Sequence, residues 1–553
     1  MNRKTLISII AGICLLSVGF ITQTDDNFVE ISKNLEIFGR LYRELNASYV
    51  DDPNPNRLMR TGIDAMLHSL DPYTTFIGED EAEDIRFMST GEYGGVGALV
   101  GKRDKKIQII EIYEGYPADQ AGLRPGDQIV KIDSTIIGPE KAVADVRKML
   151  RGDQGLMVTV EVLRSGLDKT LRVNLIREQV KVNNVPYFGM VQDKIGYIAL
   201  TGFTQDAGIE LEKALRSLRA AHPQMTGVIL DLRDNPGGRL DEAVRVANAF
   251  LPQNELIVET RGRIEGSHRA LTAPYLPVDA RIPLVVLVNG RSASASEIVA
   301  GAIQDLDRGV ILGQRSFGKG LVQNIRPLSY NTQLKVTTAK YYTPSGRCIQ
   351  AINYAERNED GSVGRIPDSL RTAYQTRNQR TVYDGGGIEP DVRIEAPPLK
   401  TITRELERQG IFFDFVSRYA QTRSSIPAAS LFVLGDGDYQ EFVTYVQGRD
   451  FSYETPADKE LEELRSLLKA EQASGAVESE LDNLARKLQQ QKDLDLNKNR
   501  AEIGQMLTRE IVRRYHYRRG LIEVSLNNDP EIAAAIEVLS DPQRYGTILN
   551  YKN

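Results

Sequence analysis

A serine in a run of small residues is the first candidate for chemistry in this sequence. Residues 289–297 read Asn-Gly-Arg-Ser-Ala-Ser-Ala-Ser-Glu, between an apolar run and a helical pattern. Small residues let backbone amides approach a ligand, and the first N–H groups of a helix can stabilise developing negative charge. Ser294 is therefore a candidate nucleophile, and the amide of Ala295 a candidate oxyanion donor. The plainer interpretation is a helix start that is capped by Ser296 and Glu297.

A lysine between two glycines is the candidate base. Lys319 lies in the segment Ser-Phe-Gly-Lys-Gly-Leu-Val-Gln, residues 316–323. A serine hydroxyl needs a base near neutral pH, and a lysine can serve when desolvation lowers its pKa. The apolar neighbours favour such an environment, and Gln323 can orient the amine without adding a charge. Taken alone, a loop lysine is more often a solvated surface residue.

A glycine turn could complete the site. Residues 229–238 read Ile-Leu-Asp-Leu-Arg-Asp-Asn-Pro-Gly-Gly, which predicts an apolar strand that ends in a tight turn. The amide of Gly237 or of Gly238 is a candidate second oxyanion donor, and the sequence does not choose between them. Most turns of this kind have no catalytic role, so the motif gains meaning only beside the other two.

Alternating strands and helices position these three segments. The pattern from 183 to 398 predicts a layered α/β domain. Its expected strands are 195–200, 227–232, 283–289 and 309–313, and its expected helices are 208–221, 241–250 and 296–305.

The flanking regions have different patterns. Residues 26–90 are predicted to be helical, and residues 399–553 are helical and charged, with an amphipathic helix or helical hairpin over 459–492. Residues 91–182 have short strands and glycine turns. The expected strands there are 106–112, 128–132, 157–163 and 169–175, and the expected helix is 141–150.

The motifs, taken together, resemble those of the C-terminal processing peptidases, also called tail-specific proteases, which use a Ser–Lys dyad. The resemblance runs from about Leu35 to Val392. It implies that Ser294 is the nucleophile, Lys319 the general base and Gln323 the residue that orients the base. It also implies an oxyanion hole made by Ala295 with Gly237 or Gly238, and structural roles for Ser292 and Ser296. The motifs that carry it lie at 70–74, 292–297, 317–320, 341–347 and 387–392.

Residues 91–182 resemble a PDZ domain, which binds a peptide C-terminus by adding it as a strand to a sheet edge. The segment Tyr-Gly-Gly-Val-Gly-Ala at 93–98 resembles the loop that captures the terminal carboxylate, and 118–127 resembles a further PDZ motif. The resemblance implies substrates with apolar C-termini and a gating role for the domain, with Arg124 as a candidate contact. The carboxylate-binding candidates are Gly94, Gly95, Val96 and Gly97.

The sequence therefore predicts a multidomain α/β protein with a PDZ-like domain (91–182), a layered, crotonase-like peptidase core (183–398) and helical regions before (26–90) and after it (399–553). The expected activity is that of a serine endopeptidase that recognises protein C-termini and cleaves near them, in envelope protein processing or quality control. Dimerisation, docking of an adaptor and shaping of a substrate tunnel are the roles considered for the C-terminal region.

Composition excludes several other classes. The net charge of −6 over 553 residues gives no reason to expect a nucleic-acid partner. With two cysteines, one of them in the apolar N-terminal segment, neither a structural disulfide nor a cysteine metal site is expected. The four histidines have no metal-ligand spacing, so no metal or cofactor is expected.

The N-terminus predicts export. Arg3 and Lys4 precede an apolar run over residues 5–22, which is typical of an export signal or a single membrane anchor. No clear small-x-small cleavage site follows, so an uncleaved anchor over residues 1–25 is favoured over a cleaved signal or a buried helix. The remainder of the chain would then lie on the periplasmic side of a bacterial inner membrane.

Three other functions would share part of this pattern. A non-catalytic, PDZ-bearing periplasmic scaffold would have kept the serine and lysine motifs only as structure. A Ser-His-Asp protease would need a histidine that faces the serine, and His268 is the one candidate in the α/β loops. A crotonase-like lyase or hydratase would share the βα layers, but it has no need of the Ser–Lys pair.

Overall fold

The computed structural model describes residues 26–551 except 168, 355, 359–361, 396–397, 450 and 472–474. The chain divides into two compact units, of which the smaller comprises the chain up to Ile77 together with Ile325–Val336. The predicted export signal or anchor, residues 1–25, lies outside the described residues. Within the described part, no helix is both long and apolar enough to span a bilayer.

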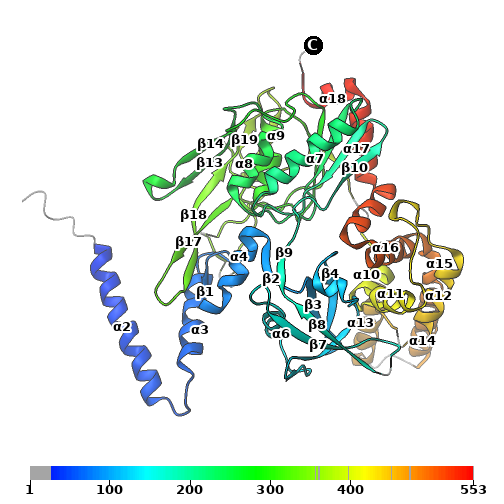
Figure 1. Ribbon diagram of the computed structural model, residues 1–553. Coiled ribbons are helices and arrows are strands. Elements are labelled where there is room, and N and C mark those ends of the chain that lie inside the picture. Colours follow the sequence, from blue (N-terminus) through cyan, green and yellow to red (C-terminus); the bar gives the residue numbers. More distant parts are fainter. Residues whose placement is uncertain are drawn as a thin grey trace, which may run out of the picture. The chain divides into compact units, whose positions relative to one another are not determined.

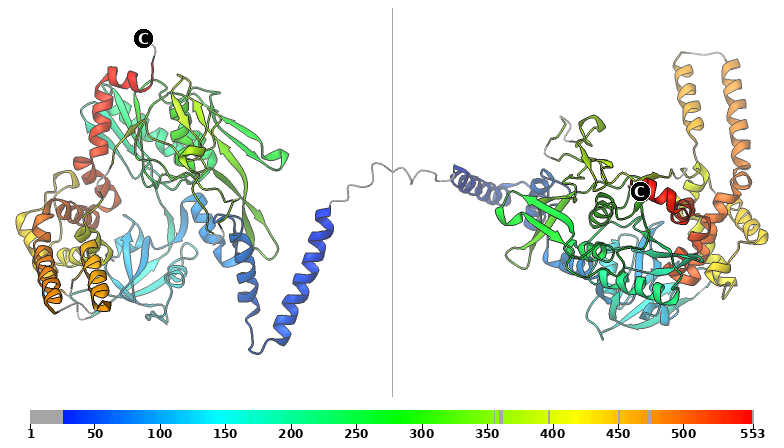
Figure 2. Two further views of the ribbon diagram at one scale, coloured as in Figure 1. Left: turned by 180° about the vertical axis from the view of Figure 1, so that it is seen from behind. Right: turned by 90° about the horizontal axis from the view of Figure 1, so that it is seen from above.

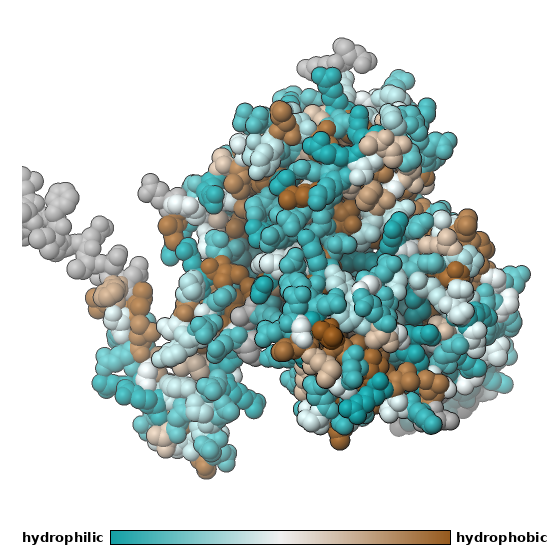
Figure 3. All heavy atoms as spheres, viewed as in Figure 1, coloured by the Kyte–Doolittle hydropathy of each residue, from teal (hydrophilic) through white to brown (hydrophobic). Residues whose placement is uncertain are grey.

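The smaller unit is mainly helical, as predicted for the N-terminal region. Helix α2 (Asp26–Ser48) is followed by α3 (Pro55–His68), which begins at a proline and is capped by the Asn54 side chain accepting from Arg57 N at 3.0 Å. Strand β1 (Thr75–Ile77) pairs antiparallel with residues 333–335. On α2, apolar side chains such as Phe28 are exposed. Figure 3 shows one face of the whole molecule, where separate apolar patches lie in a mostly polar surface.

The larger unit is built around a six-stranded sheet with the order β10-β11-β12-β15-β16-β21. The strands from β11 to β21 are parallel, and β10 joins the edge antiparallel. This confirms the expected alternation of strands and helices. The strands are β10 (Tyr187–Gln192), β11 (Ile195–Ala199), β12 (Gly227–Asp231), β15 (Leu284–Val288), β16 (Val310–Gly313) and β21 (Val392–Arg393).

Helices cover both faces of this sheet. Because side chains alternate along a strand, Val286 packs on one face while Val285 and Leu287 pack on the other. The first face is covered by α7 (Ala207–Ala221), α8 (Leu240–Asn248) and α9 (Ala295–Asp305). The second is covered by α17 (Pro530–Ser540) and α18 (Pro542–Ile548) (Figure 1). The last two helices of the predicted C-terminal region (399–553) thus pack on the core sheet.

The chain contains a second sheet. Its order is β1-β18-β13-β14, and β17 pairs with β18. Strand β17 begins just after Lys319 and carries Gln323. Its strands in the larger unit are β13 (Leu256–Gly262), β14 (Arg269–Thr272), β17 (Leu321–Pro327) and β18 (Gln333–Tyr342), the last two ending in a hairpin that belongs to the smaller unit. A short hairpin of β19 (Ala373–Gln375) and β20 (Thr381–Tyr383) follows.

The predicted PDZ-like domain has its own sheet and apolar core. Helix α4 (Ala82–Thr90) leads into β2 (Glu92–Gly95), which pairs with β9 (Glu178–Lys181) where the chain enters and leaves the domain. The sheet order is β3-β4-β5-β7-β8, so β3 is an edge strand, and β6 pairs with β5. These elements are β3 (Ala98–Arg103), β4 (Lys106–Ile112), α5 (Pro117–Gln120), β5 (Gln128–Ile132), β6 (Thr135–Ile136), α6 (Val143–Leu150), β7 (Met157–Leu163) and β8 (Thr170–Ile176).

The helical region after the core packs around aromatic side chains. The Phe412 and Phe442 rings stack at 5.4 Å, and Phe415 meets Phe442 edge-on at 5.2 Å. Helices α13 and α14 form the expected hairpin and run side by side (Figure 2, right). The helices are α10 (Thr401–Arg408), α11 (Ile411–Thr422), α12 (Asp436–Gln447), α13 (Pro456–Ala470), α14 (Gly475–Asp493), α15 (Asp495–Lys498) and α16 (Arg500–Ser525).

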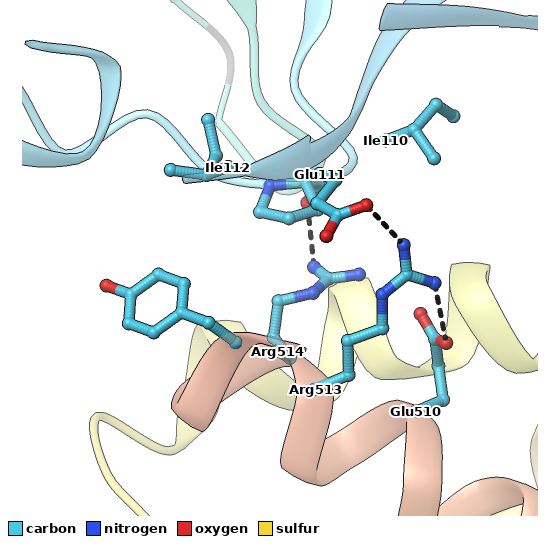
Figure 4. A pocket seen from close by; sticks show the side chains of 8 residues that line it. Ile110, Glu111, Ile112, Glu510, Arg513 and Arg514 are labelled. Atoms are coloured by element: carbon cyan, nitrogen blue, oxygen red, sulfur yellow. Dashed lines mark hydrogen bonds and ion pairs between the residues drawn. The ribbon is translucent and has the colours of Figure 1, made fainter. Parts of the chain in front are cut away.

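Helix α16 also contacts the PDZ-like domain. Figure 4 shows Arg513 reaching toward Glu111, and Arg513 Nη2 lies 3.2 Å from Glu111 Oε2. Arg514 Nη1 donates to the Pro125 carbonyl oxygen at 2.7 Å. The helix is kinked at Tyr517, where φ is +54°, and the Tyr517 hydroxyl donates to Asp119 Oδ1 at 2.7 Å. The kinked residue is therefore held by the PDZ-like domain.

Candidate active site

The three candidate segments follow three neighbouring parallel strands. The glycine turn follows β12, the serine turn follows β15 and the lysine loop follows β16. Because parallel strands have their carboxyl ends at the same edge of a sheet, the three loops meet there, which is where open α/β sheets bind ligands. Segments that are up to 90 residues apart in the chain (229 to 319) thus share one edge.

Ser294 occupies the cap position of α9 in an unusual backbone conformation. Its φ and ψ are +57° and −111°, which is costly for a residue with a side chain, by about 1–3 kcal/mol. Such a conformation persists where the surroundings fix it, and it is common at functional sites. The sequence expectation that Ser296 caps this helix is wrong: the helix begins at Ala295, so Ser296 lies inside its first turn.

The two flanking serines tie the turn to its neighbours. The Ser292 hydroxyl donates to the Leu232 carbonyl at 2.8 Å, and the Ser296 hydroxyl donates to the Asn235 carbonyl at 2.9 Å. Both side chains are fully buried. Ala293 N also donates to the Asn235 carbonyl, at 3.0 Å. The serine turn and the glycine turn are therefore joined by several hydrogen bonds.

Glu297 joins the serine turn to the lysine loop. Its Oε2 accepts from Ser294 N at 2.8 Å and from Lys319 N at 2.9 Å, while its Oε1 accepts from the Ser316 hydroxyl at 2.5 Å and from Gly318 N at 2.6 Å. The residue is 0% exposed. Burial raises the pKa of Glu297 to about 7, while these hydrogen bonds favour the ionised form.

A tyrosine makes a second bridge. Tyr341, on β18, is buried, and its hydroxyl lies 3.1 Å from the Ser294 carbonyl oxygen and also contacts the Lys319 carbonyl oxygen. Lys319 itself is half-buried. Gln323 lies on β17, where its Nε2 donates to Thr337 Oγ1 at 3.2 Å. Ser294 and Lys319 are thus fixed at the backbone on both sides.

The glycine turn lies against the serine. A Cβ at Gly237, where φ is +96°, would lie 2.9 Å from the Ser294 Cβ and 2.8 Å from Ala295 N, so only glycine fits there. Gly237 N donates to Asn235 Oδ1 at 2.9 Å. In the described part of the chain, the amides of Gly238 and Ala295 have no acceptor. These two N–H groups are therefore available to an oxyanion.

The PDZ-like domain places its candidate loop differently from the sequence expectation. Gly94 and Gly95 lie in β2, paired with β9, so the open part of the loop begins at Val96. At Gly97, φ is +77° and a Cβ would lie 2.3 Å from the Tyr116 Cβ. Strand β3 follows at the sheet edge with α6 beside it. An edge strand next to a helix can accept a peptide as an added strand.

The remaining candidates lie elsewhere. Arg124, the gating candidate, directs its Nη1 toward the Ala420 carbonyl oxygen of α11 at 3.5 Å. His268 lies at the start of β14 with Nε2 3.0 Å from the Gly262 carbonyl oxygen, in a hairpin of the second sheet. Among the described residues, no group of three or more His, Cys, Asp or Glu side chains could hold a metal ion.

Sequence reasoning missed the positioning residues. Glu297 was interpreted as the partner of Ser296, although its spacing of three from Ser294 is that of a capping box with Ser294 at the cap. Asn235 appeared only as part of a tight turn, and Tyr341 only as part of a motif. Their hydrogen bonds join distant segments, and such contacts have no local signal.

Three family models match the chain. Peptidase family S41 matches residues 194–356, a PDZ domain matches residues 108–164, and the model described as "Probable PDZ-protease, C-terminal helical domain" matches residues 402–539. The three follow one another in the order in which the structure has the PDZ-like domain, the core and the helical region.

Known proteins match over most of their length. A carboxy-terminal-processing protease of Bartonella bacilliformis is 40% identical over 358 residues, which cover 64% of this chain and 81% of the relative. A probable CtpA-like serine protease of Staphylococcus aureus strain COL is 30% identical, over 69% of this chain and 83% of the relative. The solved structure of a photosystem II D1 C-terminal processing protease is 27% identical, covers 65% of this chain and 92% of its own, and has a TM-score of 0.35. The chain therefore belongs to the carboxy-terminal-processing proteases, which are serine peptidases of family S41.

Proposed function

We propose that the protein is an endopeptidase that binds protein C-termini through its PDZ domain and cleaves near them, with Ser294 as nucleophile and Lys319 as general base. The observation that carries this proposal is Glu297, which accepts hydrogen bonds from the backbone amides of both residues in a fully buried site. A carboxylate in that position holds the serine and the lysine in a fixed relation, as a nucleophile and its base require.

In the first half of the reaction, the Ser294 hydroxyl attacks the scissile carbonyl carbon, and its proton passes to the neutral amine of Lys319. The negative charge on the carbonyl oxygen is stabilised by the amides of Ala295 and Gly238. When the C–N bond breaks, the leaving amine takes the proton from the Lys319 ammonium. The product is an acyl-enzyme ester on Ser294.

In the second half, water attacks the ester and gives a proton to Lys319, and the acid product leaves as Ser294 regains its proton. Gln323, four residues after Lys319, is proposed to orient the amine. An amide suits this task because it adds no negative charge that would favour the ammonium form. Because only the neutral amine accepts a proton, the rate is expected to rise with pH.

Recognition of the substrate is assigned to the PDZ domain. A peptide C-terminus would add to the edge of β3 beside α6, with its carboxylate near the loop that contains Val96 and Gly97. The apolar residues of this loop, such as Val96, would favour apolar C-terminal side chains. A gating role for the domain, with Arg124 as a contact, is part of the same proposal.

Export and membrane attachment are proposed from the N-terminus. The basic residues Arg3 and Lys4 and the apolar run after them support an export signal or an uncleaved anchor. The peptidase would then act on the periplasmic side of a bacterial inner membrane, in processing or quality control of envelope proteins. The C-terminal helical region is available for an adaptor or for a second copy of the chain.

The family of the chain argues against the non-catalytic scaffold, and assay of a peptide library tests the proposal. Peptides with varied C-termini are incubated with the protein, with Ser294→Ala, and with Ser267→Ala, whose serine lies in the turn between β13 and β14. We expect cleavage by the protein and by Ser267→Ala, with a preference for apolar C-termini, and none by Ser294→Ala. Equal turnover by all three proteins would refute the assignment of the nucleophile.

A further inference from the structure

Arg233 lies between strand β12 and the glycine turn, and its guanidinium is surrounded by carboxylates. Nη2 donates to Asp231 Oδ2 at 2.6 Å, and Nη1 donates to Asp529 Oδ2 at 2.6 Å and to Glu531 Oε2 at 2.5 Å. Asp231 also accepts from the Tyr197 hydroxyl at 2.7 Å. One cation thus connects the end of β12 to a segment almost 300 residues further along the chain.

The two distant carboxylates are rigidly placed. Asp529 caps α17, with its Oδ1 accepting from Glu531 N at 2.9 Å. Helix α17 is fixed to the central sheet by buried apolar residues that include Ile532 and Val538. Because the helix is anchored in this way, its first residues offer Arg233 a fixed pair of acceptors.

Arg233 depends on these ion pairs for its position. It lines a cavity of about 860 Å³, together with Asp529 and Glu531, between the core and the helical region. Its bonds to Asp231 hold it on one side, and its bonds to α17 hold it on the other.

Attachment of α17 alone does not explain this cluster. Burying charges is costly, and replacing a buried ion pair by packed apolar side chains is often neutral or stabilising. Three carboxylates surround one guanidinium, and Glu531 Oε1 is buried with no hydrogen-bond partner among the described residues. Apolar packing already fixes the helix, so the charged cluster is not needed to attach it.

The chain that leaves Arg233 carries the oxyanion donor. Gly238 lies five residues after it, across Asp234 and Gly237, which both have positive φ. Asn235 and Gly237 bond the middle of this turn to the serine turn and to Phe203 N, and the turn starts just after β12, at Arg233. Fixing Arg233 fixes that start.

We propose that Asp529 and Glu531 are positioning residues, which hold the oxyanion turn in place through Arg233. The C-terminal helices would then contribute to turnover as well as to folding. This inference rests on the proposed function, because it requires the Gly238 amide to stabilise the oxyanion. It adds to that function two residues that never touch the substrate.

The test is the double variant Asp529→Asn/Glu531→Gln. Asparagine is as good a helix cap as aspartate, so the variant removes the two charges and keeps α17. Losing an oxyanion donor costs about 10²–10³ in kcat, and displacing one should cost less, so we expect kcat to fall ~10-fold. KM and the Kd for a PDZ-binding peptide should stay within about 2-fold, because neither depends on the oxyanion.

Two control variants lie on the next helix, α18. Asp541→Asn changes the cap of α18, which accepts from Gln543 N and Arg544 N, both at 3.0 Å. Tyr545→Phe removes a buried hydroxyl that is bonded to Leu284 N at 3.0 Å. Both alter the attachment of the C-terminal helices without touching Arg233, so we expect a lower Tm for Tyr545→Phe and an unchanged kcat for both.

Each outcome decides the proposal. A double variant that keeps the kcat of the unaltered protein overturns it. It is also overturned if Tyr545→Phe, at the same loss of Tm as the double variant, loses as much kcat. If the double variant does not fold, the single variant Asp529→Asn is judged by the same criteria. Ser294→Ala distinguishes failure of this proposal from failure of the proposed function. If the proposed function is wrong, Ser294→Ala keeps its activity.

Discussion

Around Ser294 and Lys319 the contacts are buried, whereas the PDZ domain meets α16 through contacts that water reaches. Glu297, which joins the serine turn to the lysine loop, is 0% exposed. In the ion pair of Glu111 with Arg513, the two side chains are 21% and 31% exposed. The first region has several hydrogen bonds on one acceptor, and the second has single, separate contacts.

This contrast assigns different tasks to the two regions. A buried donor that loses its acceptor costs about 1–3 kcal/mol. The buried hydrogen bonds therefore fix the backbone positions of Ser294 and Lys319. Partly exposed ion pairs contribute only about 0–1 kcal/mol and weaken with salt, so the contacts of the PDZ domain with α16 cost little to break. Variants in the first region should therefore lower kcat, and variants in the second should change substrate selection.

The largest effect is expected from Lys319→Met, which removes the proposed base while keeping an apolar stem of similar length. General base catalysis contributes about 10²–10⁴, so kcat should fall ~10³-fold with little change in the Kd of a PDZ-binding peptide. Steady-state kinetics and peptide binding measure the two quantities. Lys340→Met, at an exposed lysine of β18, is the control, and equal kcat values for the two variants would exclude Lys319 as the base.

A smaller but still large effect is expected from Gly237→Ala. The added Cβ would enter the space of the Ser294 turn, and φ of +96° is unfavourable for alanine. Displacing the serine and the oxyanion donors should lower kcat about 10²-fold. Gly266→Ala is matched to it, because a Cβ there meets nothing within 4 Å. A kcat for Gly237→Ala within twofold of the control would show that the turn is not at the reacting centre.

Glu297→Gln should change both turnover and the pH dependence of stability. A glutamine NH₂ would face Ser294 N and Lys319 N in one orientation and Gly318 N in the other. Either the serine turn or the lysine loop must then move, and we expect kcat to fall ~10-fold or more. Because burial raises the pKa of Glu297 to about 7 from its usual 4.5, its contribution to stability is complete below pH 4.5 and is lost as pH rises through 7.

Thermal unfolding across pH 4–8 tests that statement. Glu297→Gln should lack the loss of Tm that Glu297 causes as pH rises through 7. Glu259→Gln, at a half-exposed residue of β13, should keep it. Identical pH profiles for Glu297→Gln and the unaltered protein would contradict the assigned pKa.

The smallest effect is expected from Tyr517→Phe, which removes the hydrogen bond from the kinked residue of α16 to Asp119. One such bond is worth about 0.5–1.5 kcal/mol, so KM for peptides with a C-terminal anchor should change about 2- to 10-fold at constant kcat. Tyr515→Phe is the control on the same helix, because its hydroxyl donates to the Arg423 carbonyl inside the helical region. A loss of kcat with unchanged KM would mean that α16 acts on the chemistry instead.

The features that were predicted correctly have local causes. The strand Gln128–Ile132 and the hairpin that starts at Met157 follow from alternation and glycine turns within a few residues. Ser294, Lys319 and the glycine turn became candidates because each lies in a short motif directly after an apolar strand. Their meeting at one edge follows from the parallel order of β12, β15 and β16.

The features that were missed depend on contacts between distant segments. Residues 284–288 read Leu-Val-Val-Leu-Val, and a strand that is apolar on both faces needs helices on both. That pattern indicates a second layer of helices, but nothing in it shows that α17 and α18 form this layer. The contact of Arg233 with Asp529 joins residues 296 positions apart, and no local pattern predicts it.

Covalent labelling of the nucleophile tests the first step of the Ser–Lys mechanism, in which the Ser294 hydroxyl forms a bond to the substrate. A fluorophosphonate probe, which reacts with activated serine hydroxyls, is added to the protein across a range of pH, and the labelled peptide is identified by mass spectrometry. The proposed mechanism predicts a label on Ser294, at a rate that rises with pH and is lost in Lys319→Met. A label on another residue, or undiminished labelling of Ser294→Ala, would contradict it.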